Sequence, residues 1–392
     1  ALASLALDGH DAVASAARTW PPFVLVAGLL LLGAVANRDG VFAAAGDLLD
    51  RLPGGDVALY LAAMGVVALV TVFLNLDTAA AFLTPVVIYV AHKRRAGEAR
   101  LLYGCLFMAN AASLLLPGSN LTNLLVPAAP GGHTLRGAVF FARMVAPWGA
   151  VVAVTAAVVG VAFRHSPPEP AAGDGPASGV EVGPAGAGRP AGSGGAAAGG
   201  PRCRGLAPRP GRLPALTLLA IGLAAALILA VPDPALLVAA VGVGLVAVRA
   251  AQRRIRLTEV AEAVDVVTIA GLFLGAAALG TLARAWSYPA HVMHSAGAVK
   301  AAVIGGVASV VVNNLPAAVL LGSRAPAHPI PLLFGLNVGP NLAVTGSLSA
   351  LVWWRAARAS GVTPSARRFS ATGAVLVPLS LAAALGAYAL AR

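Results

Sequence analysis

One acidic residue stands inside an otherwise apolar stretch of the chain. Asp77 lies between Asn75 and Thr78, and the flanking segments 57–74 and 79–91 are dominated by apolar side chains. An ionisable group inside a membrane segment is costly and by default marks an ion or proton pathway. Asp77 is therefore a candidate for taking up and releasing protons or pairing with a cation. It could also cap a half-helix that follows it, and the two roles are compatible.

Small polar side chains gather at four interruptions of the apolar sequence, and most of them are amides or hydroxyls. A neutral, hydrogen-bonding cavity suits a polyhydroxylated solute or a coordinated ion. Each side chain could instead be a helix cap or an interhelical hydrogen bond. No buried arginine is expected to face these residues, which weighs against a dicarboxylate. The candidate substrate or ion site consists of Asn75, Asp77, Thr78, Ser119, Asn120, Thr122, Asn123, Asn313, Asn314, Asn337, Asn341, Thr345, Gly346 and Ser347.

Other chemistry-bearing residues do not form a recognisable catalytic or metal-binding set. His291 and His294 are three residues apart in a predicted loop, and we expect no metal site there. Cys105 and Cys203 lie in an apolar span and a linker, so we expect structural roles for both. The sequence shows no nucleotide-binding loop and no nucleophile elbow. We therefore predict no enzyme and no cofactor, with energy drawn from an ion gradient or a separate subunit.

The surrounding sequence is that of a membrane protein. Of the 392 residues, 58% are apolar and only 11% are charged, and the apolar residues form blocks of the roughly 17–25 residues that a membrane-spanning helix needs. The net charge of +12 sits in short segments between these blocks, as the positive-inside rule describes, and does not indicate nucleic-acid binding. The basic clusters are Lys93–Arg100, Arg249–Arg256 and Arg355–Arg368.

These blocks predict an all-α polytopic protein with three parts. Residues 1–165 form an N-terminal transmembrane half, 166–212 a disordered Gly/Ala/Pro-rich cytoplasmic linker, and 213–392 a C-terminal transmembrane half. Plain spans are expected over 21–37, 138–163, 213–231, 234–250, 263–283 and 371–391, with an interfacial segment over 1–20 and a surface helix over 38–55. Interrupted stretches cover 57–91, 101–127, 298–321 and 331–354.

The interruptions come in the same order in both halves. Each half has a stretch broken by an Asn-containing tip and then a stretch broken near a Gly-Ser pair. Such paired interruptions indicate a transporter binding site at mid-membrane, because bare backbone groups survive in lipid only where they line a cavity. Ordinary Gly/Pro kinks are the alternative. Placing every basic cluster in the cytoplasm gives two re-entrant hairpins of opposite orientation, and hence an inverted repeat with two broken helices.

Several of these motifs together resemble one known family. The chain resembles the arsenite-efflux permease (ArsB-type) branch of the ion-transporter superfamily from about residue 21 onward, outside the linker. The resemblance implies export of arsenite or antimonite driven by protons, sometimes with an ATPase partner. It also implies that the N-terminal half lacks two leading spans. The motifs are Asp77–Ala80, Leu83–Pro85, Ala112–Leu114, Ser119–Leu121 with Asn123, Asn313–Pro316, Gly339–Pro340 and Gly346–Leu348.

The sequence therefore predicts a secondary active transporter, multi-pass in the cell inner membrane. Proton-coupled arsenite or antimonite efflux is the leading function. Another carrier of the superfamily, for dicarboxylate or citrate or for sodium/proton exchange, is the alternative. A receptor or an intramembrane enzyme is a different class, which solute flux in vesicles would separate. Expected partners are membrane lipid, a small inorganic solute with a proton or sodium, a cytoplasmic ATPase subunit, and a second copy in a homodimer.

Overall fold

The computed structural model describes residues 9–127, 137–165 and 214–391, and all elements in them are helical. The predicted linker, 166–212, lies outside the described residues. The first half contains α2 (Gly9–Arg38), α3 (Val41–Arg51), α4 (Asp56–Phe73), α5 (Leu76–Thr78), the π-helical η1 (Ala79–Leu83), α6 (Thr84–Arg94), α7 (Glu98–Ala112), the 3-10 turn η2 (Pro117–Ser119), α8 (Leu121–Leu125) and α9 (Gly137–Ala162). The second half contains α10 (Ala215–Ala230), α11 (Ala235–Ala251), α12 (Leu257–Val264), α13 (Val266–Ala285), α14 (Tyr288–Ser295), α15 (Ala298–Val312), α16 (Asn314–Leu321), α17 (Pro329–Val338), the 3-10 turns η3 (Gly339–Leu342) and η4 (Val344–Gly346), α18 (Leu348–Ala359) and α19 (Ala366–Leu390).

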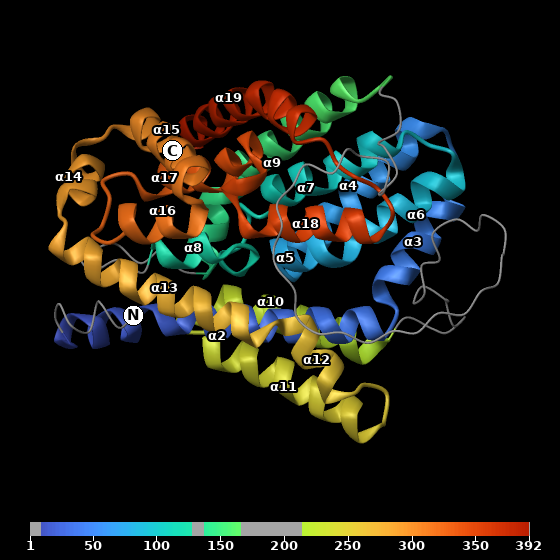
Figure 1. The fold of residues 1–392 in the computed structure, drawn as a ribbon, viewed down its shortest axis with the longest axis horizontal. Coiled ribbons are helices and arrows are strands. Elements are labelled where there is room, and N and C mark those ends of the chain that lie inside the picture. Colours follow the sequence, from blue (N-terminus) through green and yellow to red (C-terminus); the bar gives the residue numbers. More distant parts are fainter. Residues whose placement is uncertain (1–8, 128–136, 166–213, 392) are drawn as a thin grey trace, which may run out of the picture.

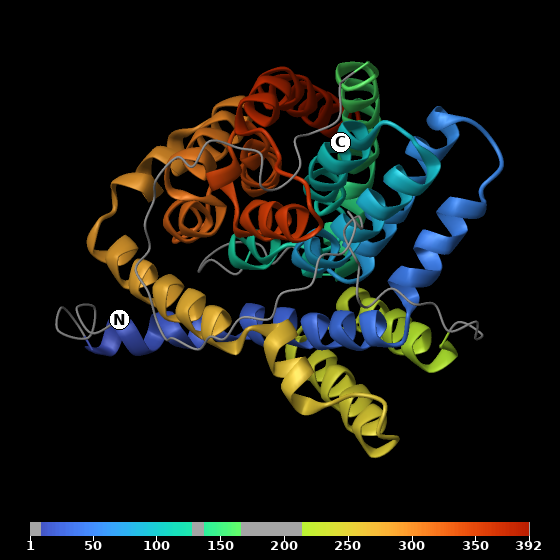
Figure 2. The same cartoon turned by 45° about the vertical axis from the view of Figure 1, so that its right-hand side comes forward.

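The helices form a layer and a bundle. Helix α2 packs against α10, α11, α12 and α13, and these five helices lie along one side of the molecule in both views (Figures 1 and 2). The remaining helices form the bundle beside this layer. Since α2 belongs to the first half and its four neighbours to the second, the two halves of the sequence are interleaved in the fold.

The bundle core is also shared between the halves. Helix α9 of the first half packs along α19 of the second. At the centre, the buried Trp353 of α18 contacts the rings of Tyr103 and Phe369, and its indole N–H donates to the carbonyl of Leu102 at 3.0 Å. Because a buried indole N–H without a partner would be costly, this bond helps to fix α18 against α7.

Five helical segments in the described chain are long and apolar enough to cross a membrane. They are Val13–Arg38, Asp56–Phe73, Gly137–Ala162, Leu257–Ala285 and Ala366–Leu390. The first corrects our prediction of an interfacial segment over residues 9–20, because α2 is continuous from Gly9 and runs through Pro21 and Pro22, while residues 1–8 lie outside the described residues. The sequence pattern predicts that these prolines begin a span, but they lie inside α2, where a membrane helix tolerates them when neighbouring helices surround it.

Two other predictions are refined. The segment 38–55 does contain a helix, α3, but Phe42 and Leu49 are buried and Phe42 stacks on Phe82 with ring centroids 5.3 Å apart, so its apolar face packs within the protein. The predicted span 263–283 is broken at Asp265, whose φ of 45° separates α12 from α13. The carboxylate of Asp265 accepts a hydrogen bond from the backbone N–H of Thr268, which caps α13.

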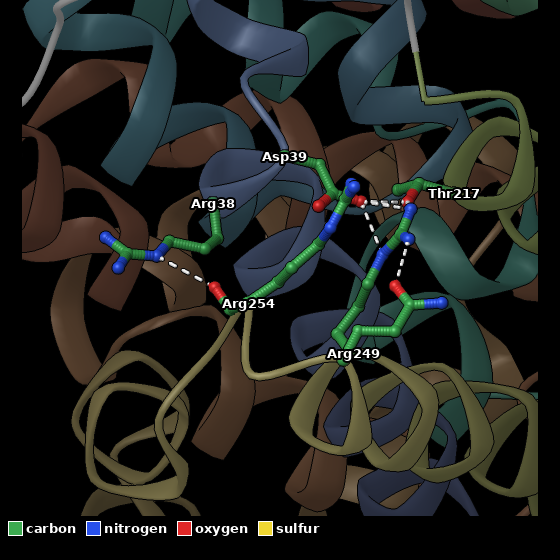
Figure 3. A network of polar contacts seen from close by, with 6 residues as sticks. Arg38, Asp39, Thr217, Arg249 and Arg254 are labelled. Carbon is green, nitrogen blue, oxygen red and sulfur yellow. Dashed lines mark hydrogen bonds and ion pairs between the residues drawn. The ribbon is translucent and has the colours of Figure 1, made fainter.

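A buried ion pair joins the two halves at one end of the helical layer (Figure 3). The carboxylate of Asp39 accepts from Arg249 at 2.8 Å, and the two side chains are only 6% and 7% exposed. The hydroxyl of Thr217 also donates to Asp39, and Arg249 donates to Gln252 at 2.8 Å. This corrects our assignment of Arg249 to a basic cluster between apolar blocks, since its guanidinium is buried with Asp39 between α2, α10 and α11.

Candidate functional site

The first interruption is a short extended break between α4 and α5. Asn75 has extended backbone, and its side-chain oxygen accepts from the N–H of Thr78 at 2.6 Å, so Asn75 caps the next turn. Asp77 lies in the first turn of α5 and is not its N-cap. The helix-capping role that the sequence allowed for Asp77 is therefore wrong. Its side chain is partly exposed and accepts from the hydroxyl of Ser349 on α18 at 2.5 Å. The acidic group therefore touches the opposite half of the chain.

Two buried polar atoms beside Asp77 find no hydrogen-bond partner among the described residues. They are the Nδ2 of Asn75 and the Oγ1 of Thr78, and both side chains are almost fully buried. Gly33 of α2 packs directly against the side chain of Thr78, because a Cβ at Gly33 would lie 2.8 Å from Cγ2 of Thr78. The chain then continues as the π-helix η1. Single π-turns are rare and often occur at functional sites.

The second interruption separates α7 from α8. Asn120 is the N-cap of α8, accepting from the N–H of Thr122 at 3.2 Å. Asn123 donates to the carbonyls of Ser113 and Leu116 at 2.7 and 3.0 Å, which satisfies two backbone oxygens left free by the break. Ser119 donates to the carbonyl of Val72 at 3.1 Å. These side chains therefore stabilise the non-helical backbone that the sequence pattern predicts.

Asn337 of α17 connects this break to the second half. Its Oδ1 accepts from Asn120 at 2.7 Å and from the hydroxyl of Ser113 at 3.0 Å. Its Nδ2 donates to Oδ1 of Asn123 at 2.9 Å and to the carbonyl of Leu333 at 2.8 Å. A side-chain amide can make about four hydrogen bonds, so Asn337 is saturated by the protein. We call Asn110, Ser113, Asn120, Asn123, Asn337 and Asn341 the amide network, since Asn110 donates to Asn341 at 2.7 Å.

The interruptions of the second half contact one another. Asn313, at a φ of 76°, caps α16 by accepting from the N–H of Leu315 at 3.3 Å and donates to the carbonyl of Thr345 at 3.1 Å. Ser347 caps α18 by accepting from the N–H of Ala350 at 3.2 Å. Gly346 packs so closely on Pro340 that a Cβ would lie 2.8 Å from its Cα. Thr345 is exposed, whereas the neighbouring Gly346 and Ser347 are buried.

The structure thus groups the sequence-predicted residues into three sets. Asn120, Asn123, Asn337 and Asn341 belong to the amide network, Asn313 contacts Thr345, and Asp77 contacts Ser349. No hydrogen bond between described residues joins Asn314 or Ser119 to these sets. Sequence reasoning missed Asn110 and Ser349, and it included Ser113 only within a family motif and not among the site residues. The spacing of Asn110 and Ser113, which puts both on one helix face just before a break, was the available signal.

The chemistry of this site is neutral apart from Asp77. Across the described ranges, no Lys or Arg side chain hydrogen-bonds to the amide network or to Asp77. Amide and hydroxyl groups can donate to the oxygens of a solute, and backbone carbonyls at helix breaks can hold a cation. The arrangement suits binding and release of a polar solute together with an ion.

Comparison with known proteins supports the prediction that this chain is a transporter. Residues 2–347 match the citrate transporter family CitMHS. The fold resembles the crystal structure of the Alcanivorax borkumensis YdaH transporter, with a TM-score of 0.52 and 18% sequence identity over 97% of this chain and 86% of that one. No curated protein matches the chain. The arsenite-efflux branch that the motifs resemble is not the family that these comparisons return. With most of its length matched, the chain belongs to the citrate transporter family CitMHS, whose members are secondary membrane transporters.

Proposed function

We propose that this chain carries citrate or a closely related small carboxylate across the cell membrane, coupled to an ion through Asp77. The observation that supports this most is the family match over residues 2–347. The alternative function that the sequence left open, a dicarboxylate or citrate carrier, thus replaces arsenite efflux as the leading proposal.

The neutral site constrains the form in which the substrate binds. Citrate has three carboxyl groups, and a fully ionised molecule would need several positive partners in a site shielded from water. The described residues offer amides and hydroxyls there instead of basic side chains. We therefore propose that the substrate enters with its charge offset, either by protons or by a bound divalent cation.

Asp77 is the proposed coupling group. It is the one carboxylate among the predicted site residues, and its contact with Ser349 joins an interruption of the first half to α18 of the second. Gain or loss of a proton or cation at Asp77 would change this contact. In the predicted inverted repeat the two re-entrant hairpins have opposite orientations. Such a change would therefore favour a conformation in which the site opens to one side of the membrane over one in which it opens to the other. An ATPase partner stays a prediction of the resemblance, and homodimer formation stays a prediction of the sequence analysis.

Uptake into proteoliposomes tests the proposal. We expect labelled citrate to accumulate when a proton gradient is imposed, with a rate that depends on added Mg²⁺ if the cation complex is the substrate. Arsenite and sodium are assayed in the same vesicles. Arsenite flux without citrate flux would overturn the citrate proposal and support the second candidate, arsenite efflux, which rests on the order of the motifs around Asp77 and Asn313.

The variant Asp77→Asn should abolish ion-driven accumulation while leaving the protein folded. Asp56→Asn is the matched control, because Asp56 is an exposed carboxylate in the first turn of α4. Unchanged coupling in Asp77→Asn would remove Asp77 from the mechanism.

A further inference from the structure

The outer surface of the bundle contains an apolar groove between α9 and α19. It has a volume of about 510 Å³ and is lined by Ala157, Val158, Val161, Ala162, Ala371, Thr372 and Val375. Six of these seven side chains are purely apolar. Both helices are candidate membrane spans, and they lie on the side of the bundle away from α2 and α11 (Figure 1). Because both helices are candidate membrane spans, we expect the groove to face lipid, and its volume falls in the range of small-molecule pockets.

Positive charge lies at one end of this groove. Arg367 is one helical turn before Ala371 and therefore on the same face of α19. Arg164 follows the end of α9, three residues after Val161, and both arginines are exposed. The N-terminus of α19, a 25-residue helix capped by Ser365, adds the partial positive charge of its free N–H groups.

These charges are available to a ligand. Arg164 donates to the ring of His165 at 3.1 Å, and neither Arg164 nor Arg367 pairs with a carboxylate in the part of the chain that the structure describes. The buried Arg100 holds the backbone of Arg164 in place, because it donates to the carbonyl oxygen of Arg164 at 3.3 Å. The apolar groove ends at these two arginines. This arrangement complements an amphiphile with an acyl chain and an anionic head.

We propose that this groove binds an anionic phospholipid, with one acyl chain along Val158, Val161 and Val375 and the phosphate between Arg164 and Arg367. The predicted topology puts this end of both helices on the cytoplasmic side, where membrane surfaces carry anionic lipid. The lipid would fill the space between α9 of the first half and α19 of the second, and so stabilise their packing. This site is separate from the candidate solute site and does not depend on which substrate the protein carries.

Native mass spectrometry of the full chain tests the proposal, after mild delipidation and addition of phosphatidylglycerol or phosphatidylcholine. We expect the wild type to retain phosphatidylglycerol preferentially. The double variant Arg164→Gln/Arg367→Gln should weaken its retention by roughly tenfold or more, given the attraction of each basic residue to anionic lipid. Arg143→Gln/Arg324→Gln is the matched control, since it removes two exposed arginines elsewhere.

A second pair of variants tests the acyl chain. Val161→Trp fills the groove from an exposed position and should lower the retention of both lipids, whereas Val139→Trp, also exposed on α9 but outside the groove, should not. The proposal is overturned if the arginine variant and its control retain phosphatidylglycerol equally. It is also overturned if the two tryptophan variants behave alike, because either result means that ordinary surrounding lipid accounts for the binding.

Discussion

Asn337 should be a structural junction between the two halves, and replacing it with leucine tests this. Leucine has the same four branched side-chain heavy atoms as asparagine and its side chain cannot form hydrogen bonds, so the change removes bonds without opening a cavity. Asn337 is fully buried and bonds to Asn120, Asn123 and the carbonyl of Leu333 at 2.7–2.9 Å. A fourth contact is weaker, because the single hydroxyl proton of Ser113 is shared between Asn337 and the carbonyl of Asn110.

The expected loss of stability follows from these bonds. Interhelical hydrogen bonds in membranes contribute about 0.6 kcal/mol each on average, and a buried polar group left without a partner costs about 1–3 kcal/mol. Two lost interhelical bonds, which leave Nδ2 of Asn120 and Oδ1 of Asn123 without a partner, and the lost bond to Leu333 within α17 together predict a destabilisation of about 2–4 kcal/mol. The N-cap bond of Asn120 and the two carbonyl bonds of Asn123 would remain, so the breaks themselves should survive.

Cys105 offers a direct assay. Its thiol is fully buried on α7, the helix that carries Asn110. In a Cys203→Ser background, a maleimide dye added during heating reports when α7 becomes accessible. We expect Asn337→Leu to lower the labelling midpoint by several degrees. Asn37→Leu is the control, because Asn37 is exposed and its side chain makes no hydrogen bond to the described residues. Equal midpoints for Asn337→Leu and wild type would refute the role of Asn337 as a junction.

Two further predictions concern other contacts between the halves. Ser349→Ala removes the hydroxyl that donates to Asp77. The loss of a hydrogen bond to a charged group should slow uptake roughly tenfold and change the pH profile of uptake. A pH profile identical to that of the wild type would exclude this contact from coupling. Asp39→Asn leaves Arg249 as a buried charge without its ion pair and should destabilise the fold by about 3–5 kcal/mol. The paired change Asp39→Leu/Arg249→Met should recover much of that loss in thermal unfolding, and a double variant no more stable than Asp39→Asn would contradict the ion-pair explanation.

The positions of the helix breaks were predictable because local sequence determines them. Asn75, Asn120 and Asn313 cap the half-helices that follow, and side chains of this type interrupt an apolar run visibly. The site contacts were less predictable. Ser349 is 272 residues from Asp77 in the chain, and nothing local indicates that pairing. The same holds for Asp39, which follows Arg38 directly, and for Arg249, which comes four residues before Arg253; both look like part of a solvated loop.

The hydrogen bonds divide the predicted site residues by role. Asn337 and Asn123 use their polar atoms on the protein itself, so they position the breaks and have little capacity left for a solute. Asn75 Nδ2, Thr78 Oγ1, Asn110 Oδ1 and Thr122 Oγ1 are buried and have no partner among the described residues. Because an unpaired buried polar group is costly, we expect a ligand, ion or water to complete these four atoms. Solute contacts should therefore fall on these four atoms and on Asp77, while substitutions at Asn337 should alter stability more than substrate selectivity.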